Sequence, residues 1–287
     1  MTLKFKWGLR SGNEPRYLGV RLRGVVDLIR PLTVLPAFTV GLLGGIILHL
    51  QLLVAFIFAL VFAMFQGGGQ ALNQANPTEI MLDRLNNKVY RPTVSGVLSS
   101  KDAYIVGYTL IICATAVGFV YGVGAASLLM AFTAISYTQQ PLYLKRFFPL
   151  SLLIQAAGRG FLPIYVLGEL AHRSTLTLAI FFLLWVVALQ STKDFGDVNG
   201  DSVFGIRTLP TLLGVKWSKI AMLGLSGVAY VYAVVAHLYV LFAMLPLDIT
   251  AILTADRPIK VAENSLGWVL FYTSLGLGYI LALTIYA

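Results

Sequence analysis

Charged residues are scarce in this chain. Only 11% of its 287 residues are Asp, Glu, Lys or Arg, whereas about a quarter of a soluble domain is charged. Hydrophobic residues make up 58% of the sequence, and no polar segment is long enough to form a second domain. These proportions exclude an ordinary soluble globular protein and predict one membrane-embedded domain over residues 1–287.

Cysteine is nearly absent as well. The only one, Cys113, lies inside an apolar run and cannot form an intramolecular disulfide, so we expect it to be inert packing. A net charge of +9 is compatible with nucleic-acid binding, but the basic residues lie between apolar spans and not along one amphipathic face. We therefore expect membrane lipid, and no nucleic acid, as a partner.

Long apolar stretches fill most of the remaining sequence. Stretches of roughly 17 to 25 residues are long enough to cross a hydrocarbon core about 30 Å thick as helices. The sequence therefore predicts an all-α integral membrane protein, a bundle of about nine transmembrane helices. Eight spans is the alternative, because residues 221–245 form an almost continuous apolar run. The expected spans are residues 31–49, 52–74, 103–122, 124–138, 149–168, 174–192, 217–236, 237–254 and 265–286.

Basic residues gather in alternate loops. Residues 1–30 hold seven Lys or Arg residues and no cleavable signal pattern, so we expect a retained, basic cytoplasmic segment. Lys and Arg are also frequent at 75–102, 139–148 and 193–216, whereas only Arg173 is clearly placed on the opposite side. The positive-inside tendency predicts a multi-pass protein of the cell membrane with these loops on the cytoplasmic face.

Acidic residues concentrate in two short segments at the ends of apolar spans. In the first segment the spacings of three, three and four place four oxygen-bearing side chains on one helix face, while Pro77 either kinks that helix or makes residue 76 a cap. The second segment has acids at i, i+3 and i+7, which predicts a single stripe on a helix. The side chains are Asn73, Asn76, Glu79 and Asp83 in the first segment, and Asp194, Asp197 and Asp201 in the second.

Clustered carboxylates repel one another unless a cation neutralises them. Oxygen ligands without His or Cys indicate Mg²⁺, which combines one or two carboxylates with water and substrate phosphates. A solvated acidic loop is the alternative, but five of twelve acids in two segments of so weakly charged a chain favour a function. The expected metal ligands are Asn76, Glu79, Asp83, Asp194, Asp197 and Asp201.

Basic residues accompany both acidic segments and suit phosphate oxygens. Positive-inside decoration explains Lys88, Arg146 and Arg207 equally well. Arg159 interrupts an apolar span, so it is either the structural partner of an acid or a substrate ligand. The residues that we expect to bind substrate are Arg30, Asn73, Arg91, Lys145, Arg159 and Lys193.

These motifs resemble the UbiA superfamily of intramembrane prenyltransferases, from Leu28-Ile-Arg30-Pro31 to the last span. Members of that family have nine transmembrane helices and two Asp-rich motifs. The second motif is similar to Lys193-Asp194-Phe-Gly-Asp197-Val-Asn-Gly-Asp201, followed by Gly205-Ile-Arg207-Thr-Leu-Pro210, and the loop from Tyr137 to Arg146 resembles the family's tyrosine and lysine segment.

The first motif departs from the family pattern Asn-Asp-x-x-Asp-x-x-x-Asp. Aligning it on Asp83 puts Glu79 and Asn76 at the two preceding Asp positions and Ala75 where Asn is usual. Aligning it on Asn73 requires two extra residues before Asp83. Either Asn73 or Asn76 can therefore take the role of the family's Asn.

The resemblance implies magnesium-dependent transfer of a polyprenyl group from its diphosphate to an acceptor. It assigns catalytic roles to Asp83, Asp194, Asp197, Asp201 and Tyr137. We expect a small aromatic acceptor such as 4-hydroxybenzoate, and thus quinone-type biosynthesis. The alternative is geranylgeranylglyceryl phosphate in ether-lipid synthesis, which needs an extra phosphate site. A cation transporter is the non-enzyme alternative, but its acids should lie near the bilayer midplane and not at span ends.

Overall fold

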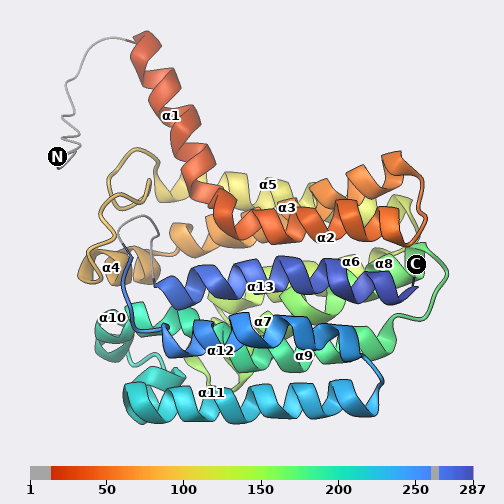
Figure 1. The fold of residues 1–287 in the computed structure, drawn as a ribbon. Helices are drawn as coiled ribbons and strands as arrows, with labels where there is room; N and C mark the ends of the chain where they lie inside the picture. Colours follow the sequence, from red (N-terminus) through yellow and green to blue (C-terminus); the bar gives the residue numbers. More distant parts are fainter. Residues whose placement is uncertain (1–13, 260–264, 287) are drawn as a thin grey trace.

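The computed structural model describes residues 14–259 and 265–286, which form a bundle of helices (Figure 1). Over these ranges no residue belongs to a named strand, and a single isolated bridge pairs Pro258 with Ser265. The all-α prediction is therefore confirmed. The elements are α1 (Glu14–Ile29), α2 (Pro31–Ile47), α3 (Leu52–Ala75), α4 (Pro77–Leu85), α5 (Ser100–Val120), α6 (Gly124–Thr138), η1 (Leu144–Arg146), α7 (Leu150–Ala156), η2 (Ala157–Phe161), α8 (Leu162–Leu170), α9 (Leu176–Leu189), η3 (Gln190–Gly196), α10 (Val198–Val203), α11 (Leu209–Val235), η4 (Tyr239–Met244), α12 (Leu245–Leu253), α13 (Leu266–Leu283) and η5 (Thr284–Tyr286).

The number of membrane spans is only partly confirmed. Within the described part of the chain, six helical segments are long and apolar enough to cross a membrane, and a seventh arises if α1 and α2, bent by 62°, form one broken span. Two shorter apolar helices, Gly124–Thr138 and Tyr239–Leu253, occupy two further ranges that the sequence marks as spans. Nine helical segments thus coincide with the nine expected ranges, but the count of about nine spans stays a prediction.

The close packing of α3 against α5 depends on glycine. A Cβ atom on Gly68 of α3 would lie 2.9 Å from the backbone oxygen of Gly107 on α5, and one on Gly107 would lie 2.7 Å from Leu72. Small residues at such crossings let two helix backbones approach closely in a membrane. Cys113, on α5, is exposed on the surface of the bundle, and its expected inertness stays a prediction.

The first acidic segment changes helix at its proline, as one of the two sequence alternatives predicts. Helix α3 ends at Ala75, and Pro77 is the first residue of α4. Between them, the Asn76 side chain accepts a hydrogen bond from the Thr78 backbone N–H at 2.9 Å and so caps α4. This arrangement suits proline, because its missing N–H costs nothing in the first turn of a helix.

The second acidic segment is not the single helical stripe that its spacing predicts. The η3 segment ends at Gly196, and Asp197 has φ −110° and ψ 0° before α10 begins at Val198. This break turns the chain between Asp194 and Asp201, so these two carboxylates do not lie on one helix face. The stripe prediction is therefore wrong.

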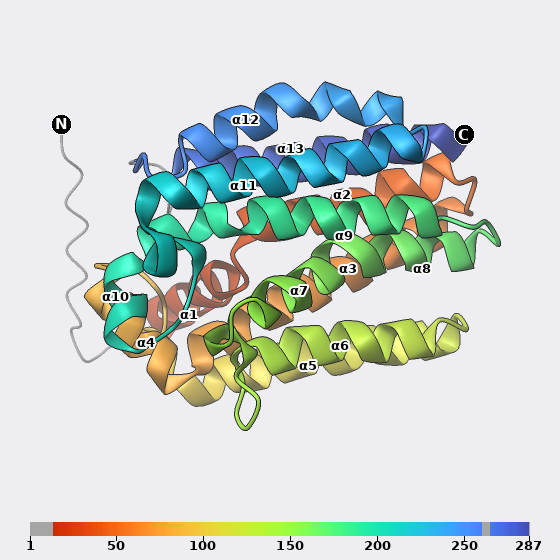
Figure 2. The same cartoon turned by 90° about the horizontal axis from the view of Figure 1, so that it is seen from below.

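Both acidic segments reach the same end of the bundle. Figures 1 and 2 show α4 and α10 side by side at the end opposite to the C-terminus. The contact is tight, because a Cβ atom on Gly200 of α10 would lie 2.7 Å from atoms of Asn86 and Leu82. Segments more than a hundred residues apart in the sequence thus form one site. Of the basic N-terminal segment, Lys4, Lys6 and Arg10 lie outside the described residues.

Candidate active site

A cavity extends from the α4–α10 end into the interior of the bundle. It holds about 1300 Å³ of space not filled by atoms, its opening included. Its walls carry acidic and basic side chains from both motif segments and aromatic side chains from the spans. Lining residues include Glu79, Asp83, Asp197, Asp201, Lys88, Arg91, Lys145 and Lys193, together with Phe62, Phe65, Trp268, Tyr272 and Tyr279.

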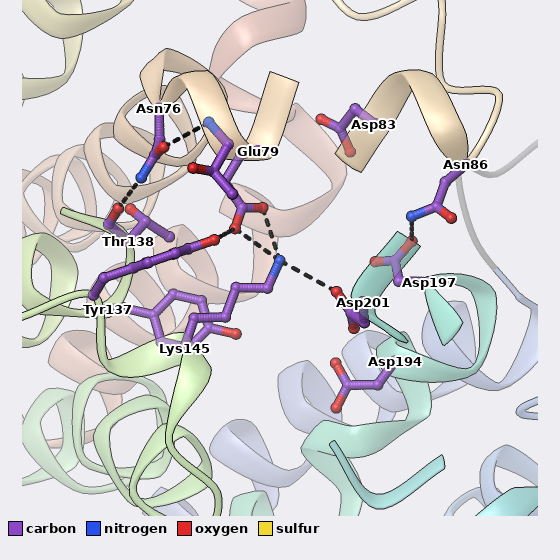
Figure 3. A network of polar contacts seen from close by, with 12 residues as sticks. Asn76, Glu79, Asp83, Asn86, Tyr137, Thr138, Lys145, Asp194, Asp197 and Asp201 are labelled. Atoms are coloured by element: carbon purple, nitrogen blue, oxygen red, sulfur yellow. Dashed lines mark hydrogen bonds and ion pairs between the residues drawn. The ribbon is translucent and has the colours of Figure 1, made fainter. Parts of the chain in front are cut away.

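Glu79 has a basic and a phenolic partner inside this cavity. The Lys145 ammonium donates to its two carboxylate oxygens at 2.7 and 2.9 Å, and the Tyr143 hydroxyl donates at 2.7 Å. Burial opposes ionisation of Glu79, but the Lys145 charge and these hydrogen bonds hold its pKa below the usual value. Figure 3 shows Lys145 reaching between Glu79 and Asp201. Tyr143 was not assigned a role from the sequence, although it lies in the segment that resembles the family's tyrosine and lysine loop.

Asp83 lies one helical turn further along α4. It accepts a hydrogen bond from the Arg91 guanidinium, and the Lys88 ammonium lies 4.0 Å from its other oxygen. Burial, together with the nearby Glu79 and Asp197 carboxylates, raises the pKa of Asp83 despite the opposing charges of Arg91 and Lys88. Asp83 and Arg91, the two residues that match the family pattern in this segment, are thus in direct contact.

Asn86 was missed from the sequence, and it connects the two acidic segments. Its amide donates to Asp197 at 3.3 Å, and its carbonyl oxygen accepts from the Gly200 backbone N–H at 3.1 Å. The Lys88 ammonium also donates to Asp197. Burial opposes ionisation of Asp197, but Lys88 and Lys145 hold its pKa well below the usual value. The sequence feature that could have indicated Asn86 is its position three residues after Asp83, directly after the end of α4.

Asp201 is deeply buried at the cavity. It is 1% exposed, its Oδ1 atom has no hydrogen-bond partner among the described residues, and the Lys145 ammonium lies 3.7 Å from that atom. Burial raises its pKa to about 7. Asp194 instead pairs with Lys193 at 2.9 Å, and Lys193 also donates to the Tyr137 hydroxyl at 2.9 Å. Asp194 is not among the residues that line the cavity, whereas Tyr137 is.

The two asparagines of the first segment have different surroundings. Asn73 lines the cavity, and its side chain is close enough to Glu79 to help lower the pKa of that carboxyl. Asn76 does not line the cavity, because its amide donates to the Thr138 carbonyl oxygen while its own carbonyl oxygen caps α4 (Figure 3). This geometry favours Asn73 over Asn76 as the asparagine that meets a ligand, while the metal role expected for Asn76 stays a prediction.

The donors present fit Mg²⁺. They are oxygen atoms, and the buried Oδ1 atom of Asp201 accepts no hydrogen bond from the described residues, with the Lys145 ammonium 3.7 Å away, so this atom is still able to serve as a ligand. Among the described residues no three His, Cys, Asp or Glu side chains are grouped closely enough to hold an ion by themselves. Magnesium, however, typically takes one or two carboxylates and completes its shell with water and substrate phosphates. The arrangement therefore suits an ion that arrives with a diphosphate.

Arg30 and Arg159 line the cavity as well. Arg30 precedes α2, donates to Gln70 at 3.1 Å and lies over the Trp268 ring at 5.6 Å. Arg159 projects from η2, donates to Gln190 at 3.0 Å and lies over the Tyr272 ring at 5.9 Å. The structure thus brings the expected substrate-binding residues into one cavity, and Asn73, Arg91, Lys145 and Lys193 line it as well.

The fold and the cavity define a multi-pass membrane protein whose interior cavity has an acidic and basic mouth, the arrangement of an intramembrane prenyltransferase. The chain belongs to the UbiA prenyltransferase family, whose model matches residues 33–275. A UbiA homologue from Archaeoglobus fulgidus, solved with DMAPP and Mg²⁺, has the same fold with a TM-score of 0.68, at 16% identity over 91% of this chain and 98% of its own.

Two relatives of known name show how wide the family is. A digeranylgeranylglyceryl phosphate synthase from Thermococcus kodakarensis is 29% identical over 79% of each chain. A homogentisate solanesyltransferase from Arabidopsis thaliana is 33% identical over 62% of this chain and 50% of its own. The protein is therefore an enzyme that transfers prenyl groups, and not the cation transporter that its acids alone allowed.

Proposed function

We propose that this enzyme transfers a polyprenyl group from its diphosphate to an acceptor, with Mg²⁺ as cofactor. The observation that carries the proposal is the meeting of two acidic segments and four basic side chains at the mouth of one cavity whose walls also carry aromatic and aliphatic side chains. Magnesium, when bound, supplies positive charge that stabilises the departing diphosphate. Asp83, Asp197 and Asp201, with Glu79, are the carboxylates placed to hold it, and Asp194 acts through Lys193.

The basic side chains at the mouth are placed to bind the diphosphate. Lys88, Arg91 and Lys193 line the cavity, and phosphate oxygens accept charge-assisted hydrogen bonds from such donors. In the reaction the bond between C1 of the prenyl chain and the diphosphate oxygen breaks, and the electron pair leaves with that oxygen. A nucleophilic atom of the acceptor forms the new bond to C1, and the released diphosphate takes the acceptor's proton. The apolar walls keep water away from the allylic cation.

The relatives favour the glycerophosphate acceptor over 4-hydroxybenzoate. The relative that shares 79% of its length with this chain is named for a glycerophosphate product. We therefore place geranylgeranylglyceryl phosphate first among candidate acceptors. An aromatic acceptor remains the second candidate, because another relative is named for homogentisate and because Trp268 and Tyr272 present aromatic rings to the cavity. We propose that the motif loops face the cytoplasm, which the distribution of Lys and Arg supports.

The test is a transfer assay with purified enzyme in lipid nanodiscs. Geranylgeranyl diphosphate is the donor, and the acceptors are geranylgeranylglyceryl phosphate, homogentisate and 4-hydroxybenzoate, each with Mg²⁺ or with EDTA. We expect a prenylated product, detected by mass spectrometry, from at least one acceptor and only with Mg²⁺.

A matched pair of variants controls for general effects of charge removal. Asp197→Asn alters a carboxylate that lines the cavity, whereas Asp256→Asn alters one that is 40% exposed and pairs with Lys219 outside it. We expect the first variant to lose turnover and the second to retain it. Transfer in the presence of EDTA, or equal activity of the two variants, would contradict the proposal.

A further inference from the structure

Arg159 is a charged side chain in a membrane span with neutral neighbours. Over the described ranges its guanidinium has no carboxylate partner within 4.0 Å, and its contacts are the Gln190 amide oxygen and the Tyr272 ring. Charged residues inside membrane spans are costly, and they usually face a polar cavity and serve a function. The position of Arg159 thus requires an explanation that the acidic segments do not give.

The basic residues at the cavity mouth differ from Arg159 in this respect. Lys88 pairs with Asp197, Arg91 with Asp83, Lys145 with Glu79 and Lys193 with Asp194. Each of these cations has a carboxylate from a motif segment beside it. The alternative that Arg159 is the structural partner of an acid therefore has no support among the described residues.

The backbone around Arg159 is built to present this side chain. Residues Ala157–Phe161 form a π-helical turn between α7 and α8, a rare conformation that is frequent at functional sites. Glycines flank Arg159, and a Cβ atom on Gly160 would lie 2.4 Å from the Phe182 backbone oxygen, so that neighbour must be glycine. The π turn thus packs tightly against α9 on one side and directs Arg159 to the cavity on the other.

The Gln190 side chain holds the Arg159 guanidinium by accepting a hydrogen bond from it. Gln190 is fully buried, and it is the first residue of η3, the segment that also carries Lys193 and Asp194. Gln190 lies four positions before Asp194, which is about 8 Å along a 3₁₀ segment at a rise of roughly 2.0 Å per residue. Arg159 therefore lies on the membrane-interior side of the second acidic segment.

We infer that Arg159 binds the anionic group of the acceptor, a carboxylate or a phosphate. Resting on the proposed function, this inference places the acceptor deeper than the diphosphate, with its nucleophilic atom directed toward the motif residues. The guanidinium keeps N–H donors beyond the one given to Gln190, and it matches the two oxygens of a carboxylate or phosphate. Tyr272 and Trp268, whose rings are 5.1 Å apart on α13, form an aromatic wall beside this position.

The test measures binding without turnover, using two pairs of compounds in which only one member carries the anionic group. The first pair is homogentisate and its methyl ester, and the second is geranylgeranylglyceryl phosphate and geranylgeranylglycerol. We expect the wild-type enzyme to bind the anion of one pair at least about tenfold more tightly than its neutral partner. The pair that shows this preference identifies the source of the anion.

Variants at Arg159 then test the assignment. Arg159→Gln should abolish the preference for the anion and leave the affinity for geranylgeranyl diphosphate within about twofold, because donor phosphates bind elsewhere. Arg159→Lys, which keeps the charge, should retain part of the preference. The matched control is Arg173→Gln, an exposed arginine in the loop between α8 and α9, which should behave as wild type. Thermal unfolding of each variant shows whether the protein is folded.

Three outcomes overturn the inference. It fails if the wild-type enzyme prefers neither anion, if Arg159→Gln keeps the preference, or if the loss in Arg159→Gln falls on the donor diphosphate. Loss of folding in Arg159→Gln leaves Arg159→Lys and the wild-type comparison to decide. Should anion binding depend on Arg159 while no acceptor is prenylated, the proposed function fails and the anion site stands.

Discussion

Removing the Lys145 ammonium should destabilise the folded enzyme more than removing any exposed lysine. Lys145 is buried, bonds both oxygens of the buried Glu79 carboxylate and lies 3.7 Å from Asp201. Loss of one partner from a buried ion pair typically costs about 3–5 kcal/mol, because the remaining charge is left without compensation. For a chain of this size, at about 2–4 °C per kcal/mol, Lys145→Met should lower Tm by about 6–20 °C.

The assay is thermal unfolding of the purified protein in one detergent and at one scan rate, because unfolding of large proteins is often irreversible. The matched control is Lys219→Met. Its ammonium lies 2.6 Å from an oxygen of Asp256, but that carboxylate is 40% exposed, so we expect a change of about 0–1 kcal/mol. The double variant Lys145→Met with Glu79→Gln removes both charges of the buried pair and should recover a large part of the loss.

Two results would refute this reasoning. One is a decrease in Tm for Lys145→Met that is no larger than the decrease for Lys219→Met. The other is a double variant that is no more stable than Lys145→Met alone, since the two charges would then not compensate each other. Either result would show that the contact between Lys145 and Glu79 does not carry the energy assigned to it.

Three further predictions concern the motif segments. Alanine at any one of Asp83, Asp194, Asp197 and Asp201 should reduce turnover by at least about 100-fold. Near wild-type activity in all four variants would refute the metal assignment. Asn86→Ala removes the hydrogen bond to Asp197, and the loss of one such bond should raise the Mg²⁺ concentration for half-maximal activity by about 2- to 10-fold. An unchanged magnesium titration would show that Asn86 does not position Asp197. Single cysteines placed at Asn87, Phe147 or Ser202 in a Cys113→Ser background should react with an impermeant reagent from the cytoplasmic side. Labelling of any one of them from the outside alone would contradict the cytoplasmic placement of the motif loops.

Much of the fold could be predicted from the sequence, because a membrane imposes a simple length requirement on apolar helices. The expected ranges 52–74 and 124–138 match α3 and α6 to within one residue at each end. The number of true spans could not be fixed in this way. Gly124–Thr138 and Tyr239–Leu253 are apolar but short, and length alone does not show whether such helices cross.

The sequence predicted many of the residues that form the candidate site, but it did not predict which side chains pair with each other. Residue type and spacing indicated which carboxylates gather at one end, but they did not indicate that Lys145 would bond Glu79. Such pairs join segments far apart in the sequence and depend on the packing of α4 against α10. The stripe expected for Asp194, Asp197 and Asp201 was wrong for a local reason, since the backbone leaves the helical conformation at Asp197.

The order of charges along the cavity can orient two substrates at once. Around the mouth the described residues include five carboxylates and four basic side chains, and all of them except Asp194 line the cavity. This region is therefore close to neutral and alone attracts a multiply charged diphosphate only weakly. The residues are Glu79, Asp83, Asp194, Asp197 and Asp201 with Lys88, Arg91, Lys145 and Lys193. A diphosphate that takes donors from Lys88 or Arg91 also removes counter-charge from the acids, which then favour a divalent cation beside it. Deeper in the cavity Arg159 has a neutral partner and offers positive charge to a second anion. With the diphosphate held at the mouth and the acceptor anion held further inside, C1 of the donor would lie between the two anionic groups.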